Sequence, residues 1–301
     1  MSVLASDKTW LVWTGMETDL IFNEGYDLPE FSAFPMIDSE EGRDRLHRYY
    51  EKLIEIGRST GHGVFLDTPT WMANPDRAAA VGYAAGDMPR VTKDCVEFAK
   101  GIKEAEPFAS CLVSVQVGPR GDGYKAGMAT VDGAKKYHGR QIRAAKEAGA
   151  DIVSAYTLGS AEEAIGISLS AKDHDIPVLI SFTVETDGKL ANGMSLSETV
   201  AILNRQAKPD AIIVNCAHPD HIANAFDGGA WEEHISGFVA NASRQSHEEL
   251  DNSETLDDGD PEELGQQLSE LKAAKAGFKI LGGCCGTDLR HMQSIAEKTG
   301  A

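Results

Sequence analysis

Short apolar, β-branched segments alternate with longer amphipathic segments along the whole chain, and this alternation limits the possible folds more than any other feature. The expected strands are residues 10–15, 64–68, 111–117, 151–157, 177–184, 211–217, 234–243 and 279–285. Strands that are apolar throughout are typical of a parallel sheet covered by helices. Eight strand–helix units within 301 residues fit a (β/α)8 TIM-type barrel of the α/β class. An open doubly wound sheet is the alternative, and it is weakened because no GxGxxG or GxxxxGK[ST] motif follows any strand.

The segments between these strands have helical periodicity. In residues 40–57, Leu46, Tyr49, Tyr50 and Leu53 fall on one face. The other expected helices are residues 75–86, 131–149, 160–174, 195–206, 219–226, 261–277 and 288–300. Two insertions stand out, residues 21–39 after the first strand and residues 244–260 after the seventh. No change of composition marks a linker, so we expect one domain over residues 1–301.

The overall charge excludes several classes of partner. The chain has 47 acidic and 28 basic residues, a formal net charge of −19, which argues against nucleic acid and anionic membranes. No apolar run approaches the roughly 20 residues that span a bilayer, and MSVLASDKTWLVW lacks the features of a signal peptide. We therefore predict a cytoplasmic protein with small-molecule partners, and a homo-oligomer is compatible with the sequence. The acidic run at 248–263 is interpreted as a solvated loop rather than a cation or partner site.

The five cysteines divide into two groups. Cys95 and Cys111 have apolar neighbours and are expected in the core, whereas Cys216 ends the sixth expected strand and Cys284 and Cys285 end the eighth. In a barrel, the ends of strands six and eight face the same mouth, where active sites of this fold lie. Three thiols and one open position are the arrangement of a catalytic zinc site. An odd cysteine count without a secretory signal does not suggest a disulfide framework.

Adjacent cysteines can reach one ion only if the backbone leaves strand geometry, because successive side chains of a strand point to opposite faces. Gly282, Gly283 and Gly286 surround the pair and permit this. The alternatives are buried thiols that bind nothing and a redox pair. A vicinal pair lacks the CxxC spacing of thioredoxin-like proteins, so zinc is favoured.

GGCCGT near the C-terminus and IIVNCAHP upstream resemble the homocysteine S-methyltransferase family, which includes betaine–homocysteine and S-methylmethionine–homocysteine methyltransferases. The resemblance covers nearly the whole chain through TGMETDL, SVQVGPRGDGY, KKYHGRQIRAAKEAGAD and PVLISFTVETDGKLANG. It implies a barrel in which Cys216, Cys284 and Cys285 hold Zn²⁺. Gly15 and Met16 of the first motif belong to the substrate site in this interpretation, and Asn215 orients the site by hydrogen bonding.

The ligand set implies a reaction. Zinc favours the thiolate form of a thiol substrate, whose free pKa is about 8.5, so no separate protein nucleophile is needed. The thiolate then attacks a methyl group on a good leaving group. We expect a small onium donor, such as S-methylmethionine or betaine, because the chain lacks the further domains of the cobalamin route and its acidity disfavours an anionic folate. Trp13, Trp71 and Tyr156 are candidates to hold the cation, with a core role as the alternative.

The sequence departs from the family where the amino group of homocysteine binds. The family uses an Asp at the start of the first motif and a Glu at the end of the fourth strand. These positions align with Trp13, or with Thr14 under another gap placement, and with Tyr156. Glu17 and Asp67 are candidate substitutes. The sequence thus predicts an intact zinc half of the site and altered recognition of homocysteine, with a related thiol as the alternative acceptor.

Two other functions and three further candidate residues are compatible with the sequence. A zinc-binding barrel without methyltransferase activity is the main alternative; the altered motifs favour it, and the complete cysteine set disfavours it because idle thiolates oxidise. Aldol or hydrolytic chemistry is the third option, and the absence of a lysine at a strand end argues against Schiff-base chemistry. His218 and His221 are outside candidates for metal binding near a helix start. Arg120 is either a carboxylate-binding residue or a solvent-exposed loop residue.

Overall fold

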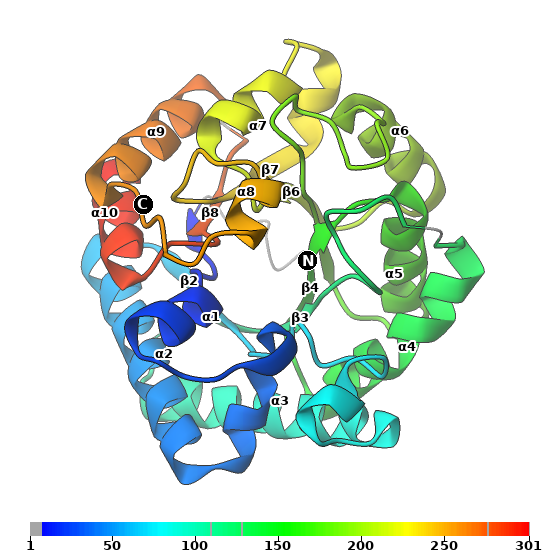
Figure 1. Ribbon diagram of the computed structural model, residues 1–301, viewed down its shortest axis with the longest axis vertical. Helices are drawn as coiled ribbons and strands as arrows, with labels where there is room; N and C mark the ends of the chain where they lie inside the picture. The colour runs from blue at the N-terminus through cyan, green and yellow to red at the C-terminus, as the bar shows by residue number, and fades with distance from the viewer. Residues whose placement is uncertain (1–7, 109, 128, 276, 301) are drawn as a thin grey trace.

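The computed structural model describes residues 8–108, 110–127, 129–275 and 277–300, so most of the segment used to argue against a signal peptide lies outside the described residues. The strands are β1 (Trp10–Leu11), β2 (Gly63–Asp67), β3 (Cys111–Val117), β4 (Ile152–Leu158), β5 (Val178–Phe182), β6 (Ala211–Asn215), β7 (Ile235–Ala240) and β8 (Ile280–Gly283). They are parallel, pair in chain order and close into a barrel because β8 also pairs with β1 (Figure 1). The (β/α)8 fold is confirmed, and the open doubly wound sheet is excluded.

The long helices surround the barrel, whereas α8 (His247–Asp251) lies near its centre in the view of Figure 1. The α-helices of the described residues are α1 (Met16–Thr18), α2 (Glu40–Thr60), α3 (Met88–Ala105), α4 (Val131–Ala148), α5 (Ala161–Asp173), α6 (Leu196–Ala207), α7 (Pro219–Ala225), α8, α9 (Pro261–Ala274) and α10 (Leu289–Thr299). α2 shows how the sequence directs them. Ser39 caps its first turn by accepting a hydrogen bond from Gly42 N, and Gly61 ends it at φ +82°. Its buried face contains Tyr49 and Tyr50, as the periodicity predicts. Within the described residues, no helix is long and apolar enough to cross a membrane.

The expected helix at 75–86 is wrong. The structure has two 3-10 turns there, Ala78–Val81 and Ala85–Asp87, and the long helix α3 begins only at Met88. Gly82 adopts φ +84° and ends the first turn, whereas a proline in the first turn of α3 suits a helix start. The alanines of 75–86 have high helix propensity, but this glycine and the packing of the segment override it.

The barrel interior is filled by side chains. The buried cluster inside it consists of Trp10, Val12, Phe65, Ile152, Tyr156, Leu179, Ala211, Ile213, Val239 and Ile280. A second, larger cluster lies between the strands and the helices. The expected strands at 10–15 and 279–285 are longer than the observed β1 and β8, because the chain leaves strand geometry at the barrel mouth.

The long insertion after β7 is folded rather than extended into solvent. It contains α8, which lies near the centre of the barrel in Figure 1. Most carboxylates of the acidic run are exposed, yet Asp257 accepts a hydrogen bond from Ser243 Oγ at 2.6 Å, and Asp258 pairs with Arg290 at 2.8 Å. The acidic run therefore includes a segment that is bonded to Ser243, just after β7, and to Arg290 in α10.

Candidate metal centre and substrate pocket

Three cysteine side chains meet at the mouth of the barrel, as the strand order predicts. Cys216 follows β6, and Cys284 and Cys285 follow β8. Their sulfur atoms all lie within 4.8 Å of one another, with Cys216 Sγ 3.6 Å from Cys285 Sγ. In this structure Cys216 and Cys284 are joined as a disulfide, with their Cα atoms 5.4 Å apart. Among the described residues, these three form the one group of His, Cys, Asp or Glu side chains close enough to share a metal ion.

The backbone conformation around the cysteines explains how the sulfur atoms of Cys216 and of the adjacent Cys284 and Cys285 come together. Cys216 has a left-handed conformation with φ +55°, which costs a residue with a Cβ about 1–2 kcal/mol. Gly286 adopts φ +80° directly after the vicinal pair, whereas Gly282 and Gly283 still belong to β8. A Cβ atom at Gly15 would collide with the carbonyl oxygen of Cys284, so this loop approaches the pair as closely as a backbone can. The expected departure from strand geometry therefore occurs at Cys216 and Gly286.

The three sulfurs suit a thiophilic metal ion. In a tetrahedral site with Zn–S bonds of about 2.3 Å, sulfurs are about 3.8 Å apart, close to the 3.6 Å between Cys216 and Cys285. Ligation requires the Cys216–Cys284 disulfide to be reduced, because thiolates are the ligands. Burial raises the pKa of the Cys285 thiol to about 12, so this thiol is protonated at neutral pH when no cation is bound. The donor set thus fits a metal ion in the reduced protein.

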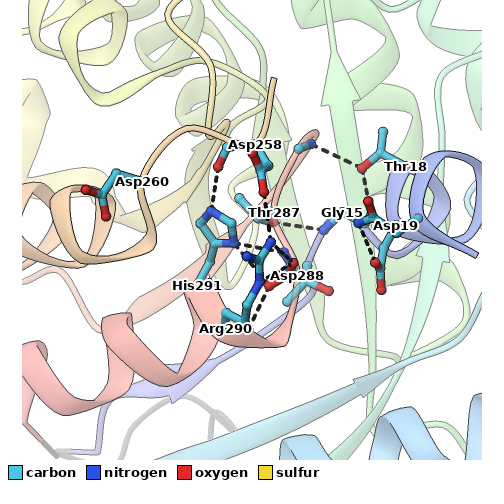
Figure 2. A network of polar contacts seen from close by, with 12 residues as sticks. Gly15, Thr18, Asp19, Asp258, Asp260, Thr287, Asp288, Arg290 and His291 are labelled. Atoms are coloured by element: carbon cyan, nitrogen blue, oxygen red, sulfur yellow. Dashed lines mark hydrogen bonds and ion pairs between the residues drawn. The ribbon is translucent and has the colours of Figure 1, made fainter. Parts of the chain in front are cut away.

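A polar network joins the loops on either side of the cysteine loop (Figure 2). Gly15 N donates to Thr287 Oγ1 at 3.0 Å, and Gly286 N donates to Thr18 Oγ1 at 3.1 Å, which ties the loop after β1 to the loop after β8. On the other side, His291 Nε2 donates to the carbonyl of Asp258 at 2.8 Å. The first loop, the cysteine loop and the insertion after β7 are therefore held as one unit.

A small apolar cavity of about 50 Å³ lies directly against the cysteines. Its lining includes Trp13, Thr14, Gly15, Glu17, Phe31, Trp71, Gln116, Tyr156, Asn215, Cys216, Cys284 and Cys285. Most of the predicted substrate residues thus come together. Two of them, Met16 and Asp67, are fully buried and do not line this cavity.

Asn215 is held in one orientation beside the cysteines. Its Oδ1 accepts hydrogen bonds from Thr157 N at 2.9 Å and from Ser181 Oγ at 2.5 Å. Its Nδ2 donates to Thr157 Oγ1 at 2.8 Å and lies 3.9 Å from Cys284 Sγ. The amide therefore points its N–H group toward the sulfur.

The two carboxyl groups considered as substitutes face the aromatic residues. Glu17 Oε2 accepts a hydrogen bond from Trp13 Nε1, and Asp67 Oδ2 accepts one from Tyr156 Oη, each at 3.3 Å. Burial raises the pKa of both Glu17 and Asp67 to about 7. Asp67 Oδ1 has no hydrogen-bond partner within the described part of the chain. Neither group offers a fully ionised carboxylate at neutral pH, and of the bonded pair Tyr156 and Asp67 only Tyr156 lines the cavity.

Sequence reasoning missed several residues near the cysteines. Tyr124 Oη donates to Cys216 Sγ at 3.1 Å, although Tyr124 lies within the SVQVGPRGDGY segment that resembles the family. Cavities of about 300 and 260 Å³ adjoin Cys285, and Phe31, Tyr124 and Asp251 line both. The signal available was the position of the two insertions beside the expected mouth, but sequence alone cannot show how they fold over it.

The weaker candidates lie away from the sulfur atoms. His218 caps α7 by accepting a hydrogen bond from Asp220 N, as expected for a residue at the start of a helix. Arg120 pairs with Asp76 at 3.0 Å, and its guanidinium lies 4.6 Å from the ring centroid of Tyr137. The structure places His218, His221 and Arg120 outside the group of three sulfurs.

A closed (β/α)8 barrel with three thiols gathered at its mouth is the arrangement that the sequence resemblance implies. Residues 44–299 match the family model described as homocysteine S-methyltransferase, and the chain belongs to this family. It is a methyltransferase that transfers a methyl group to a thiol, and its substrates are small molecules.

Curated relatives carry the same family description, and solved structures share the fold. Homocysteine S-methyltransferase 1 of Arabidopsis thaliana is 24% identical over 299 residues, covering 89% of this chain and 86% of its own length. Homocysteine S-methyltransferase of Escherichia coli is 27% identical over 252 residues, covering 77% and 78%. The fold is similar to that of the homocysteine methyltransferase MmuM from Escherichia coli in its oxidised form (TM-score 0.75, 20% identity) and its metallated form (TM-score 0.73, 21% identity). Each comparison covers 98% of this chain and 97% of MmuM.

Proposed function

We propose that this chain, acting as one catalytic domain over residues 1–301, transfers a methyl group from a small onium donor to a thiol in a zinc-dependent reaction. Cys216, Cys284 and Cys285 are the proposed zinc ligands. The observation that carries the proposal is the convergence of three sulfur atoms within 4.8 Å at the barrel mouth, beside an apolar cavity. No cobalamin or nicotinamide is required. The alternative of a zinc-binding barrel without methyltransferase activity conflicts with the family membership.

The residues around the sulfurs would prepare the acceptor. Zinc at this position would stabilise the thiolate form of a thiol acceptor at neutral pH. Asn215 and Tyr124 direct N–H and O–H groups at cysteine sulfurs, which fixes the orientation of the ligands. The apolar cavity excludes water from the acceptor sulfur, and this preserves its nucleophilicity because a thiolate is most reactive when it is poorly hydrated.

The donor would occupy the cavities that adjoin Cys285. Phe31 and Tyr124 present aromatic faces there, and Asp251 supplies a carboxylate. Aromatic faces attract quaternary ammonium and similar cations by about 0.5–2 kcal/mol. A cationic methyl donor therefore has both an aromatic and an acidic contact within reach of the acceptor site.

The direct test is an assay of the reduced, zinc-loaded protein with paired donors and acceptors, followed by mass spectrometry of the products. S-methylmethionine and betaine would each be offered with homocysteine and with 3-mercaptopropionate. We expect S-methylated product with at least one onium donor, and loss of turnover in Cys285→Ala. Turnover that depended wholly on methylcobalamin or methylfolate would contradict the proposal.

A further inference from the structure

The strained backbone of Cys216 is held from both sides. Cys216 N donates to the carbonyl of Val239 in β7 at 3.0 Å. The Cys216 carbonyl lies 2.5 Å from His247 Nε2 and also accepts a bond from Thr183 Oγ1 at 3.4 Å. A left-handed conformation at a residue other than glycine persists only where the surroundings impose it. These contacts impose it here, at φ +55°.

His247 is itself fixed by a second contact. It is the first residue of α8, and its Nδ1 lies 2.9 Å from Glu185 Oε1 in the loop after β5. Its side chain is only 11% exposed. Both ring nitrogens of His247 therefore face oxygen atoms, Nδ1 the Glu185 carboxylate and Nε2 the Cys216 carbonyl. The insertion after β7 thus delivers a donor to the backbone of Cys216.

Tyr124 completes the contact from a third loop. Its ring lies 4.2 Å from the ring of His247, centroid to centroid, and its hydroxyl donates to Cys216 Sγ at 3.1 Å. Cys216 is therefore restrained at its amide, its carbonyl and its sulfur. His221 provides a comparison, since it lies close enough to His247 for their charges to interact, yet within the described part of the chain it does not belong to the group of three cysteines.

We propose that Glu185, His247 and Tyr124 form a positioning unit for Cys216, and that this unit sets the affinity of the three-cysteine centre for its metal ion. The inference rests on the proposed function, because it assumes that Cys216 is a metal ligand. None of the three residues is itself proposed to bind the metal. A ligand whose backbone is fixed in advance loses less freedom on binding, and partners that orient metal ligands are typically worth 10–100-fold in affinity.

The test measures zinc affinity by competition with a chromophoric chelator, using the reduced full-length protein. His247→Phe keeps a ring against Tyr124 but removes the two ring nitrogens that contact Glu185 and the Cys216 carbonyl, so we expect zinc to bind about 10–100-fold more weakly. Glu185→Gln keeps an oxygen acceptor for His247 and should lose less affinity than His247→Phe. The matched control His221→Phe should bind zinc as the wild type does. The melting temperature of each zinc-free variant shows whether the fold is intact, and cobalt substitution reports the ligand geometry.

The outcomes are distinguishable. Weaker zinc binding and an altered cobalt spectrum in His247→Phe, with an unchanged zinc-free melting temperature, support the inference. Equal zinc affinity in His247→Phe and wild type overturns the positioning role and leaves the proposed function intact. If His247→Phe does not fold, Tyr124→Phe takes its place, since it loses only the hydroxyl that is bonded to Cys216. Unchanged zinc affinity in Tyr124→Phe would also overturn the positioning role. A wild-type protein that binds no zinc overturns the proposed function and this inference together.

Discussion

The predicted replacement of two ammonium-binding carboxylates by Trp13 and Tyr156 should change the preferred acceptor. Both aromatic residues line the cavity against the cysteines. Asp67 accepts a hydrogen bond from Tyr156 and does not line that cavity, and Glu17 already accepts the indole N–H of Trp13. The amino group of homocysteine would therefore enter a mainly apolar cavity in which its family partners are absent.

The size of the effect follows from the lost contacts. A charge-assisted hydrogen bond contributes about 1.5–3 kcal/mol, so two lost bonds cost about 3–6 kcal/mol. At about 1.4 kcal/mol per tenfold, this is at least on the order of a hundredfold in kcat/KM. Glu17 does not stand at either of the two family positions, and its Oε2 already accepts the indole N–H of Trp13. We expect wild type to use 3-mercaptopropionate about a hundredfold better than homocysteine.

The assay compares kcat/KM for the two acceptors in wild type, Tyr156→Glu and Tyr156→Gln, each with the same donor. Tyr156→Glu restores a carboxylate where the family has one and should gain homocysteine activity. Tyr156→Gln has a similar shape without the charge and serves as the matched control, which should not gain it. Equal or better use of homocysteine by wild type would refute the reasoning, as would an equal gain in both variants.

Three further predictions follow from the same region. Asp67→Asn tests whether the protonation of Asp67 is coupled to folding. Burial raises the pKa of Asp67 from 3.8 to about 7, so the free energy of unfolding of wild type should fall as pH rises through that interval. The loss relative to the variant should reach up to about 4 kcal/mol at pH 8. Denaturant unfolding at pH 4 and pH 8 measures this, and parallel pH profiles would contradict it. Gly15→Ala should lower both zinc content and melting temperature, at a cost of about 1–3 kcal/mol, because its Cβ meets the carbonyl of Cys284; an unchanged zinc content would argue against the close approach. Phe31→Ala should raise the donor KM about 2–30-fold, as expected for a lost cation–π contact, and should raise the acceptor KM less; an effect on the acceptor KM alone would contradict this location for the donor.

The fold and the meeting of the cysteines were predictable because both follow from local patterns and from barrel closure. Apolar runs of strand length define the eight strands, and closure in chain order brings the ends of β6 and β8 to one mouth. Cys216, Cys284 and Cys285 therefore had to lie near one another once the strands were assigned. The exception at 75–86 has a local cause, since Gly82 adopts a left-handed conformation that alanine-rich neighbours cannot offset.

The rest of the site depends on contacts that no local pattern encodes. The alternation of side chains along β2 predicts which face of the strand Asp67 is on. It does not predict whether the carboxyl lines the cavity or bonds to Tyr156 without lining it. His247 reaches the Cys216 carbonyl only because the acidic insertion folds back over the mouth, across 31 positions of the chain. Loop packing of this kind is set by tertiary contacts, so sequence periodicity gave no indication of Glu185, His247 or Tyr124 as neighbours of Cys216.

The central claim is that three cysteines hold one zinc ion and leave room for the acceptor thiol. X-ray absorption at the zinc edge, measured on the reduced full-length protein with and without a thiol acceptor, tests it most directly. The claim predicts one zinc per chain with three sulfur neighbours near 2.3 Å, and a fourth sulfur when the acceptor is added. A zinc ion with fewer than three sulfur neighbours, or a sulfur count that does not rise with the acceptor, would contradict it.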